Sequence, residues 1–176
     1  MKKFSYLVVL LLSAACLRAQ DQPASGQSHE KVYAVFVMNF AKYIVWPANR
    51  TSGEFVIGVL GSSSIMEELK AAAAVKMIGS QKIRVKDCKS SKDIDGCHLI
   101  FVSDSKSSIV PEVITRVSGE PTLVVTEKEG LARKGGGISF VASSGRVRFE
   151  INKTAIEKKG LNVSSTLANL GVVVED

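Results

Sequence analysis

The chain has 176 residues, of which 23 are Lys or Arg and 17 are Asp or Glu, so its formal net charge is +6. The length fits one domain with a full-sized core, and the ordinary composition, 45% hydrophobic, excludes a chain that is disordered throughout. The basic residues form no dense block, which argues against the clustered electrostatic footprint of a nucleic-acid-binding surface.

The first 19 residues predict a secretory signal peptide. Two Lys follow Met1, and then come the apolar run YLVVLLLSAA and small residues. That run is shorter than the roughly 20 residues that a membrane-spanning helix needs, and no later segment qualifies. We expect cleavage after Ala19, which leaves no transmembrane span in the mature chain. Cleavage lowers the net charge from +6 to +3, because it removes Lys2, Lys3 and Arg18 and no acidic residue.

Cys16 offers a second route of processing. The stretch LSAAC resembles a bacterial lipoprotein signal, in which the Cys carries the lipid anchor. The large apolar residue that such a signal has three places before the Cys is Ser13 here, and Leu12 lies one place too early. Simple cleavage is therefore favoured over lipidation of Cys16, and both routes predict an exported protein, free in the periplasm or tethered only at its N-terminus.

Residues 20–28 predict a flexible leader, and residues 29–176 predict the folded domain. Ser28 can cap a helix that runs to about Tyr43, and Trp46-Pro47 ends it because Pro cannot continue the helical hydrogen bonds. The apolar residues at helical spacing define one stripe, which is expected to face the core. The members of this stripe are Val32, Val35, Phe36, Phe40 and Ile44.

Val37 and Met38 fall outside this stripe and have no assigned core role. They form a candidate partner surface together with Trp46, although a Trp at a helix end is first expected to be a packing residue. The alternative for Val37 and Met38 is that they simply cover a sheet.

Three short apolar runs predict buried strands, at residues 55–61, 97–103 and 121–127. Two helices are expected at 62–76 and 105–119, and a half-exposed strand is expected from the alternation in QKIRVKDC, residues 81–88. After residue 137 the pattern predicts a hairpin with its turn at Ser143-Ser144-Gly145, followed by short helices at 152–160 and 164–171. The tail VVVED fits either a helix end or a strand.

This order of elements predicts a single-domain α/β fold. Apolar strands that alternate with helices indicate a mixed sheet with parallel central strands and flanking helices. The C-terminal antiparallel hairpin is expected to extend this sheet at one edge.

Cys88 and Cys97 are the two cysteines that remain in the domain. In an oxidising compartment such a pair is more often bridged than free, so a structural disulfide is expected first. Two buried thiols and a redox switch are the alternatives. No metal site is expected, because two Cys and the neighbouring His98 fall short of a closed tetrahedral set.

The sequence contains no convincing catalytic constellation and no cofactor motif, so we do not expect an enzyme. His98 is expected to be a hydrogen-bonded structural residue. The turn GVLGSSS leads into a helix N-terminus, where Ser62, Ser63 and Ser64 form a candidate ligand or anion site, although most such turns are only capped helix starts. ARKGGG, residues 132–137, predicts a mobile turn first and an anion-binding nest second.

Six stretches occur in a recognisable order between about Tyr33 and Leu170. They are FAKYIVWP, FVIGVLG, CHLIFVS, LVVTEKEGLARKGGGISFV, RVRFEIN and GLNVSSTLANL. In this series the chain resembles the YfiR family of bacterial periplasmic regulatory proteins. Cys97 stands where the family often has a Cys that opens the CHxxF strand, and Cys88 is a plausible partner for it.

The resemblance implies a non-enzymatic periplasmic regulator without a cofactor. Such a protein binds and controls an inner-membrane signalling protein, a diguanylate cyclase or a histidine kinase, and acts as a repressor that affects cyclic di-GMP and biofilm formation. A homodimer contact is compatible with this role. The alternative hypothesis is a periplasmic sensor that binds a small ligand at the strand ends, where open α/β sheets place their ligands.

Overall fold

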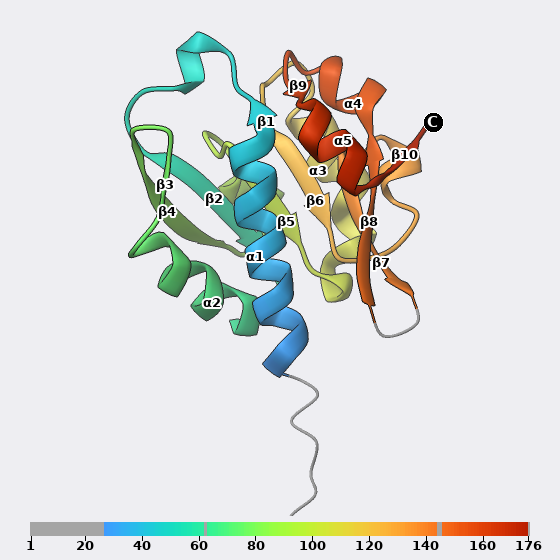
Figure 1. Ribbon diagram of the computed structural model, residues 1–176, viewed down its shortest axis with the longest axis horizontal. Helices are drawn as coiled ribbons and strands as arrows, with labels where there is room; N and C mark the ends of the chain where they lie inside the picture. The colour runs from blue at the N-terminus through green and yellow to red at the C-terminus, as the bar shows by residue number, and fades with distance from the viewer. Residues whose placement is uncertain (1–26, 62, 144–145, 176) are drawn as a thin grey trace, which may run out of the picture.

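The computed structural model describes residues 27–61, 63–143 and 146–175, and the expected signal peptide, Cys16 and Ser62 lie outside these ranges (Figure 1). The helices are α1 (Gln27–Tyr43), α2 (Ser63–Ala73), α3 (Val110–Arg116), α4 (Lys153–Glu157) and α5 (Ser165–Leu170). Short 3-10 turns are η2 (Ala48–Arg50), η3 (Ser91–Asp93), η4 (Asp104–Ile109) and η5 (Ala132–Lys134). α1 therefore begins at Gln27, within the last two residues of the expected leader.

The described strands form one eight-stranded sheet and one two-stranded sheet. The strands of the large sheet are β2 (Phe55–Leu60), β3 (Met77–Ile78), β4 (Gln81–Cys88), β5 (Leu99–Val102), β6 (Leu123–Thr126), β7 (Ile138–Ser143), β8 (Arg146–Asn152) and β10 (Val172–Val174). The small sheet pairs β1 (Ile44–Val45) with β9 (Asn162–Val163) in antiparallel orientation.

The strand order of the large sheet is β10-β8-β7-β6-β5-β2-β4-β3. Strands β4, β2, β5, β6 and β7 run parallel to one another. β3 pairs with β4 in antiparallel orientation, and β7 and β8 form the antiparallel hairpin. These observations confirm the predicted fold class. The hairpin is not itself the edge, however, because the tail forms β10, which pairs in parallel with β8 and places Val173 opposite Ile151.

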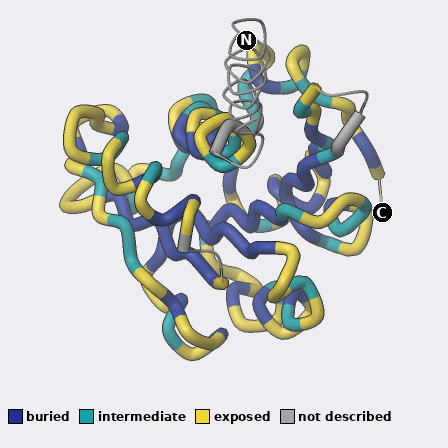
Figure 2. Tube along the Cα trace, turned by 90° about the horizontal axis from the view of Figure 1, so that it is seen from below, coloured by how far each residue is buried: buried dark blue, intermediate teal, exposed yellow. Residues whose placement is uncertain are grey.

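Helices cover both faces of the sheet, and each face has its own apolar core. Figure 1 shows α1 crossing one face and α3 lying behind the sheet. α1, α2, α4 and α5 contribute to the larger core, whereas α3 closes the smaller one. β2, β5 and β6 are buried along their whole length because they lie between these layers, and the burial-coloured tube of Figure 2 shows this buried centre.

The predicted core-facing stripe of α1 is confirmed at Phe40 and Ile44, which are 0% and 3% exposed, and is wrong at Val32 and Val35. Val32 and Val35 are 37% and 49% exposed, whereas Val37 and Met38 are 0% and 3% exposed. The buried face consists of Ala34, Val37, Met38, Phe40, Ala41 and Ile44. Most of the circumference of this helix is apolar, so apolar spacing alone could not identify the inner face; the small Ala34 and Ala41 belong to it because α1 packs against both α2 and the sheet.

Candidate functional site

Cys88 and Cys97 lie on either side of β2, and their thiols meet above Gly58. Cys88 ends β4, and Cys97 lies two residues before β5, the other neighbour of β2. A Cβ atom on Gly58 would lie 2.8 Å from Sγ of Cys97 and 3.2 Å from Sγ of Cys88. Gly58 therefore makes room for both sulfur atoms in the core beneath α3.

The two cysteines are free thiols that hydrogen-bond to each other. This hydrogen bond lowers the pKa of Cys88 and raises the pKa of Cys97, and burial raises the pKa of Cys97 further. Both residues are at most 2% exposed, so the chemistry open to the pair is first of all with each other. A disulfide between them stays a prediction.

His98 is a buried structural residue at the start of β5. Its Nδ1 accepts a hydrogen bond of 3.1 Å from the backbone N–H of Val56, which leaves Nε2 protonated to donate to the carbonyl oxygen of Arg50, also at 3.1 Å. Burial lowers the pKa of His98 to about 4, and the positive charge of Arg50 lowers it in the same direction. The ring is thus held in one neutral tautomer.

Trp46 packs against this histidine. Its ring centroid lies 5.0 Å from that of Phe55 and 5.8 Å from that of His98, both in edge-to-face orientation, and Nε1 donates to the carbonyl oxygen of Ala41 at 2.8 Å. Nη2 of Arg50 donates to the carbonyl oxygen of Cys97 at 2.7 Å. Trp46 therefore ties the end of α1 to the sheet, which is an architectural role.

The Gly-rich segment before β7 is held by buried side chains. Ser139 Oγ accepts from the N–H of Ala132 at 2.6 Å and lies 2.7 Å from Oγ1 of Thr126. Asn152 Nδ2 donates to the carbonyl oxygen of Ala132, and its Oδ1 accepts from the N–H of Ala155, each at 2.8 Å. The expectation of a mobile turn here is corrected, because Asn152 joins this loop to the N-terminus of α4.

Nothing described in this loop points to an anion-binding nest. Nε of Arg133 lies 3.4 Å from a carboxylate oxygen of Glu150, so its charge already has a partner. The spacing of Thr126, Ser139 and Asn152 in the sequence does not predict that they contact one another's loops. The sequence predicts only that Asn152 can cap the helix that follows it.

The candidate serine site is only partly described. Ser63 begins α2, and Ser64 is exposed on its first turn. These residues follow β2 and so lie at the carboxyl end of that strand. The cavity described below lies at the other end of the parallel strands, away from Ser63 and Ser64.

The apolar residues that are exposed near α1 differ from the ones predicted. Val37 and Met38 belong to the core, so they cannot form a partner surface in this fold. Val32 and Val35 of α1 are exposed instead. On α5, which contacts α1, and on β10 the exposed apolar residues are Leu170, Val172 and Val173. We call these five residues the α1–β10 surface.

Metal-binding clusters and membrane-spanning helices are both absent from the described ranges. No group of three or more His, Cys, Asp or Glu residues is placed there to hold a metal ion. None of the helices in the same ranges is both long and apolar enough to cross a membrane.

Comparison with known proteins places the chain in a family. A family model described as YfiR/HmsC-like matches residues 30–172. No curated protein matches the chain. Among solved structures, the chain is similar to the ABC domain in complex with L-Trp from Streptococcus pneumonia, with 15% sequence identity and a TM-score of 0.54. The match covers 80% of this chain and 60% of that chain, and at this identity it shows a shared fold alone.

Proposed function

Because the chain belongs to the YfiR/HmsC-like family, we propose that it is a periplasmic regulator that binds and controls an inner-membrane signalling protein. The partner is a diguanylate cyclase or a histidine kinase. The regulator holds it inactive, so that release of the partner changes cyclic di-GMP and biofilm formation. Export depends on the signal peptide proposed for residues 1–19, with lipidation of Cys16 as the less favoured route.

The observation that carries this proposal is the extent of the family match. Residues 30–172 span nearly all of the described α/β domain, so the likeness concerns the whole folded unit and not one motif. The buried polar side chains of His98, Ser139 and Asn152 are engaged in hydrogen bonds that hold the fold. This use of buried polar groups supports a binding role over a catalytic one.

The α1–β10 surface is the proposed contact with the partner. Its five apolar side chains are exposed on α1, on α5, which contacts α1, and on β10, which follows α5. Exposed apolar surface of this kind is typical of protein–protein contacts. β10 also ends the sheet, so its free backbone groups can pair with a strand of the partner.

The test is co-purification from membranes of the native host, with the captured proteins identified by mass spectrometry. We expect the purified protein to capture a membrane cyclase or kinase, and Val35→Glu combined with Val173→Glu to lose it. Val75→Glu is the matched control, because Val75 is 82% exposed and lies outside this surface. Capture of no such enzyme would contradict the proposed function, and capture that survives the double substitution would contradict the proposed surface.

A further inference from the structure

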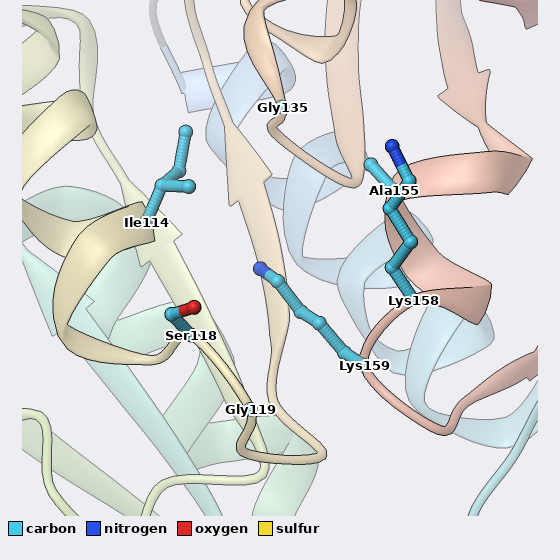
Figure 3. A pocket seen from close by; sticks show the side chains of 7 residues that line it. All are labelled: Ile114, Ser118, Gly119, Gly135, Ala155, Lys158 and Lys159. Carbon is cyan, nitrogen blue, oxygen red and sulfur yellow. The ribbon is translucent and has the colours of Figure 1, made fainter.

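A cavity lies between α3 and α4, at the end of the sheet where the parallel strands have their first residues. Ser118 and Gly119 precede β6, Gly135 precedes β7, and α4 follows β8, which runs antiparallel to β7. Figure 3 shows the side chains of Ile114 and Ser118 on one side and those of α4 on the other. The cavity thus lies at the amino ends of the parallel strands, whereas the predicted serine site follows the carboxyl end of β2.

The walls leave room for a small molecule with an apolar part. The cavity has a volume of about 200 Å³, below the roughly 300–1,000 Å³ of pockets for drug-sized ligands. Two wall positions are glycines with left-handed backbone, Gly119 at φ 83° and Gly135 at φ 86°, so no side chain fills the space there. Ile114 and Ala155 supply apolar contact.

Lys159 supplies a cation to this space. Its side chain extends from the turn after α4 toward α3, between Gly135 and Ser118 (Figure 3). Burial lowers the pKa of Lys159 to about 8. None of the seven described residues that line the cavity is acidic, and Lys158 adds a second amine to the wall. A half-buried ammonium group without a carboxylate nearby is costly, and an anionic ligand would offset that cost.

We propose that the cavity between α3 and α4 binds a small organic carboxylate. The carboxylate contacts Nζ of Lys159 and the hydroxyl group of Ser118, and a short apolar chain packs against Ile114 and Ala155. This proposal goes beyond the regulatory function and does not depend on it, since the cavity and the α1–β10 surface have no residue in common.

The test is an NMR titration of the purified protein with butyrate, followed through the backbone amides of Gly119 and Gly135. We expect saturable shifts at both amides. 1-Butanol, which has a similar apolar chain and no charge, should not produce them. Inorganic phosphate is the third probe, because it carries the charge without the apolar chain and is expected to bind more weakly than butyrate.

The matched variants are Lys159→Met and Lys153→Met, since Lys153 begins α4, shortly before Lys159 in the chain, and lies outside the cavity wall. Loss of a charge-assisted hydrogen bond should weaken butyrate binding by about tenfold or more in Lys159→Met and leave it unchanged in Lys153→Met. As a measurement that needs no variant, butyrate should slow acetylation of Lys159 at pH 8 without slowing that of Lys70, which is exposed and paired with Glu67.

Four results would overturn the proposal. They are the absence of saturable shifts, equal binding of 1-butanol, stronger binding of phosphate than of butyrate, and unchanged binding by Lys159→Met. None of them bears on the capture of a membrane partner, so failure here is distinguishable from failure of the proposed function.

Discussion

His98 and Val56 are joined by two hydrogen bonds across neighbouring strands. The backbone N–H of His98 donates to the carbonyl oxygen of Val56 at 2.8 Å, and the N–H of Val56 donates to Nδ1 of His98 at 3.1 Å. The imidazole therefore completes the strand pairing at the point where β2 and β5 begin. Because a protonated Nδ1 cannot accept this bond, the pairing depends on the neutral ring.

Stability is therefore expected to fall in mild acid. The folded pKa of His98 is about 4, below its ordinary value of 6.5, so the unfolded chain binds a proton in this interval that the folded chain does not. The contribution is fully present above pH 6.5 and is lost as the pH falls toward 4. It amounts to about 3 kcal/mol by the conversion of 1.36 kcal/mol per pKa unit.

Urea unfolding between pH 7 and pH 4 measures this effect. The loss of unfolding free energy should be smaller in His98→Asn than in the wild-type protein. His29→Asn is the control, because His29 is exposed on α1, and it should keep the wild-type pH dependence. Equal slopes for His98→Asn and the wild type would contradict the assignment to His98.

Gly58→Ala tests the space above β2. The added methyl carbon would lie 2.8 Å and 3.2 Å from the two sulfur atoms, so we expect a destabilisation of about 1–3 kcal/mol from overpacking. Thermal or urea unfolding measures it. The same substitution in a Cys97→Ala background should cost markedly less, since the closest sulfur is then gone. A cost that is equal in both backgrounds would show that the thiols are not what occupies this space.

Cys88 and Cys97 are expected to form a disulfide under oxidising conditions, since their thiols are in contact above Gly58 of the intervening strand β2. Closing this short loop should stabilise the folded chain by about 2–3 kcal/mol in the chain-entropy model. Thiol titration of the unfolded protein and melting temperatures with and without reductant measure both effects. A Cys88→Ser, Cys97→Ser double variant should not respond to reductant, and two titratable thiols after oxidation would contradict the bridge.

Asn152→Ala should destabilise the domain by about 2–3 kcal/mol, because it removes the cap of α4 and leaves the carbonyl oxygen of Ala132 without its buried donor. Chemical unfolding measures the change. Asn169→Ala, on the exposed surface of α5, serves as the control and should be within about 0.5 kcal/mol of the wild type. Hydrogen exchange should also speed up at the amide of Ala132 in Asn152→Ala, and an unchanged rate there would show that Asn152 does not hold the loop.

The sequence by itself determined the α/β class. Continuous apolar runs such as FVIGVL and LIFV place apolar side chains on both faces of a strand, and both faces are buried only when layers cover the sheet on each side. It also identified Cys88 and Cys97 as a pair, since they are the only cysteines of the domain. The packing role of Trp46 and the structural role of His98 likewise followed from their positions beside a helix end and a buried strand.

Only the tertiary structure decided which faces and which distant residues meet. α1 is apolar around most of its circumference, so the choice of Val37 over Val35 as a core residue depended on how α2 and the sheet pack against it. The tail VVVED fits a helix or a strand locally, and pairing with β8 made it a strand. The cavity at Lys159 exists because α3 and α4, separated along the chain, end on either side of two glycines. No local pattern encodes that juxtaposition, since it arises from the packing of the two helices around one end of the sheet.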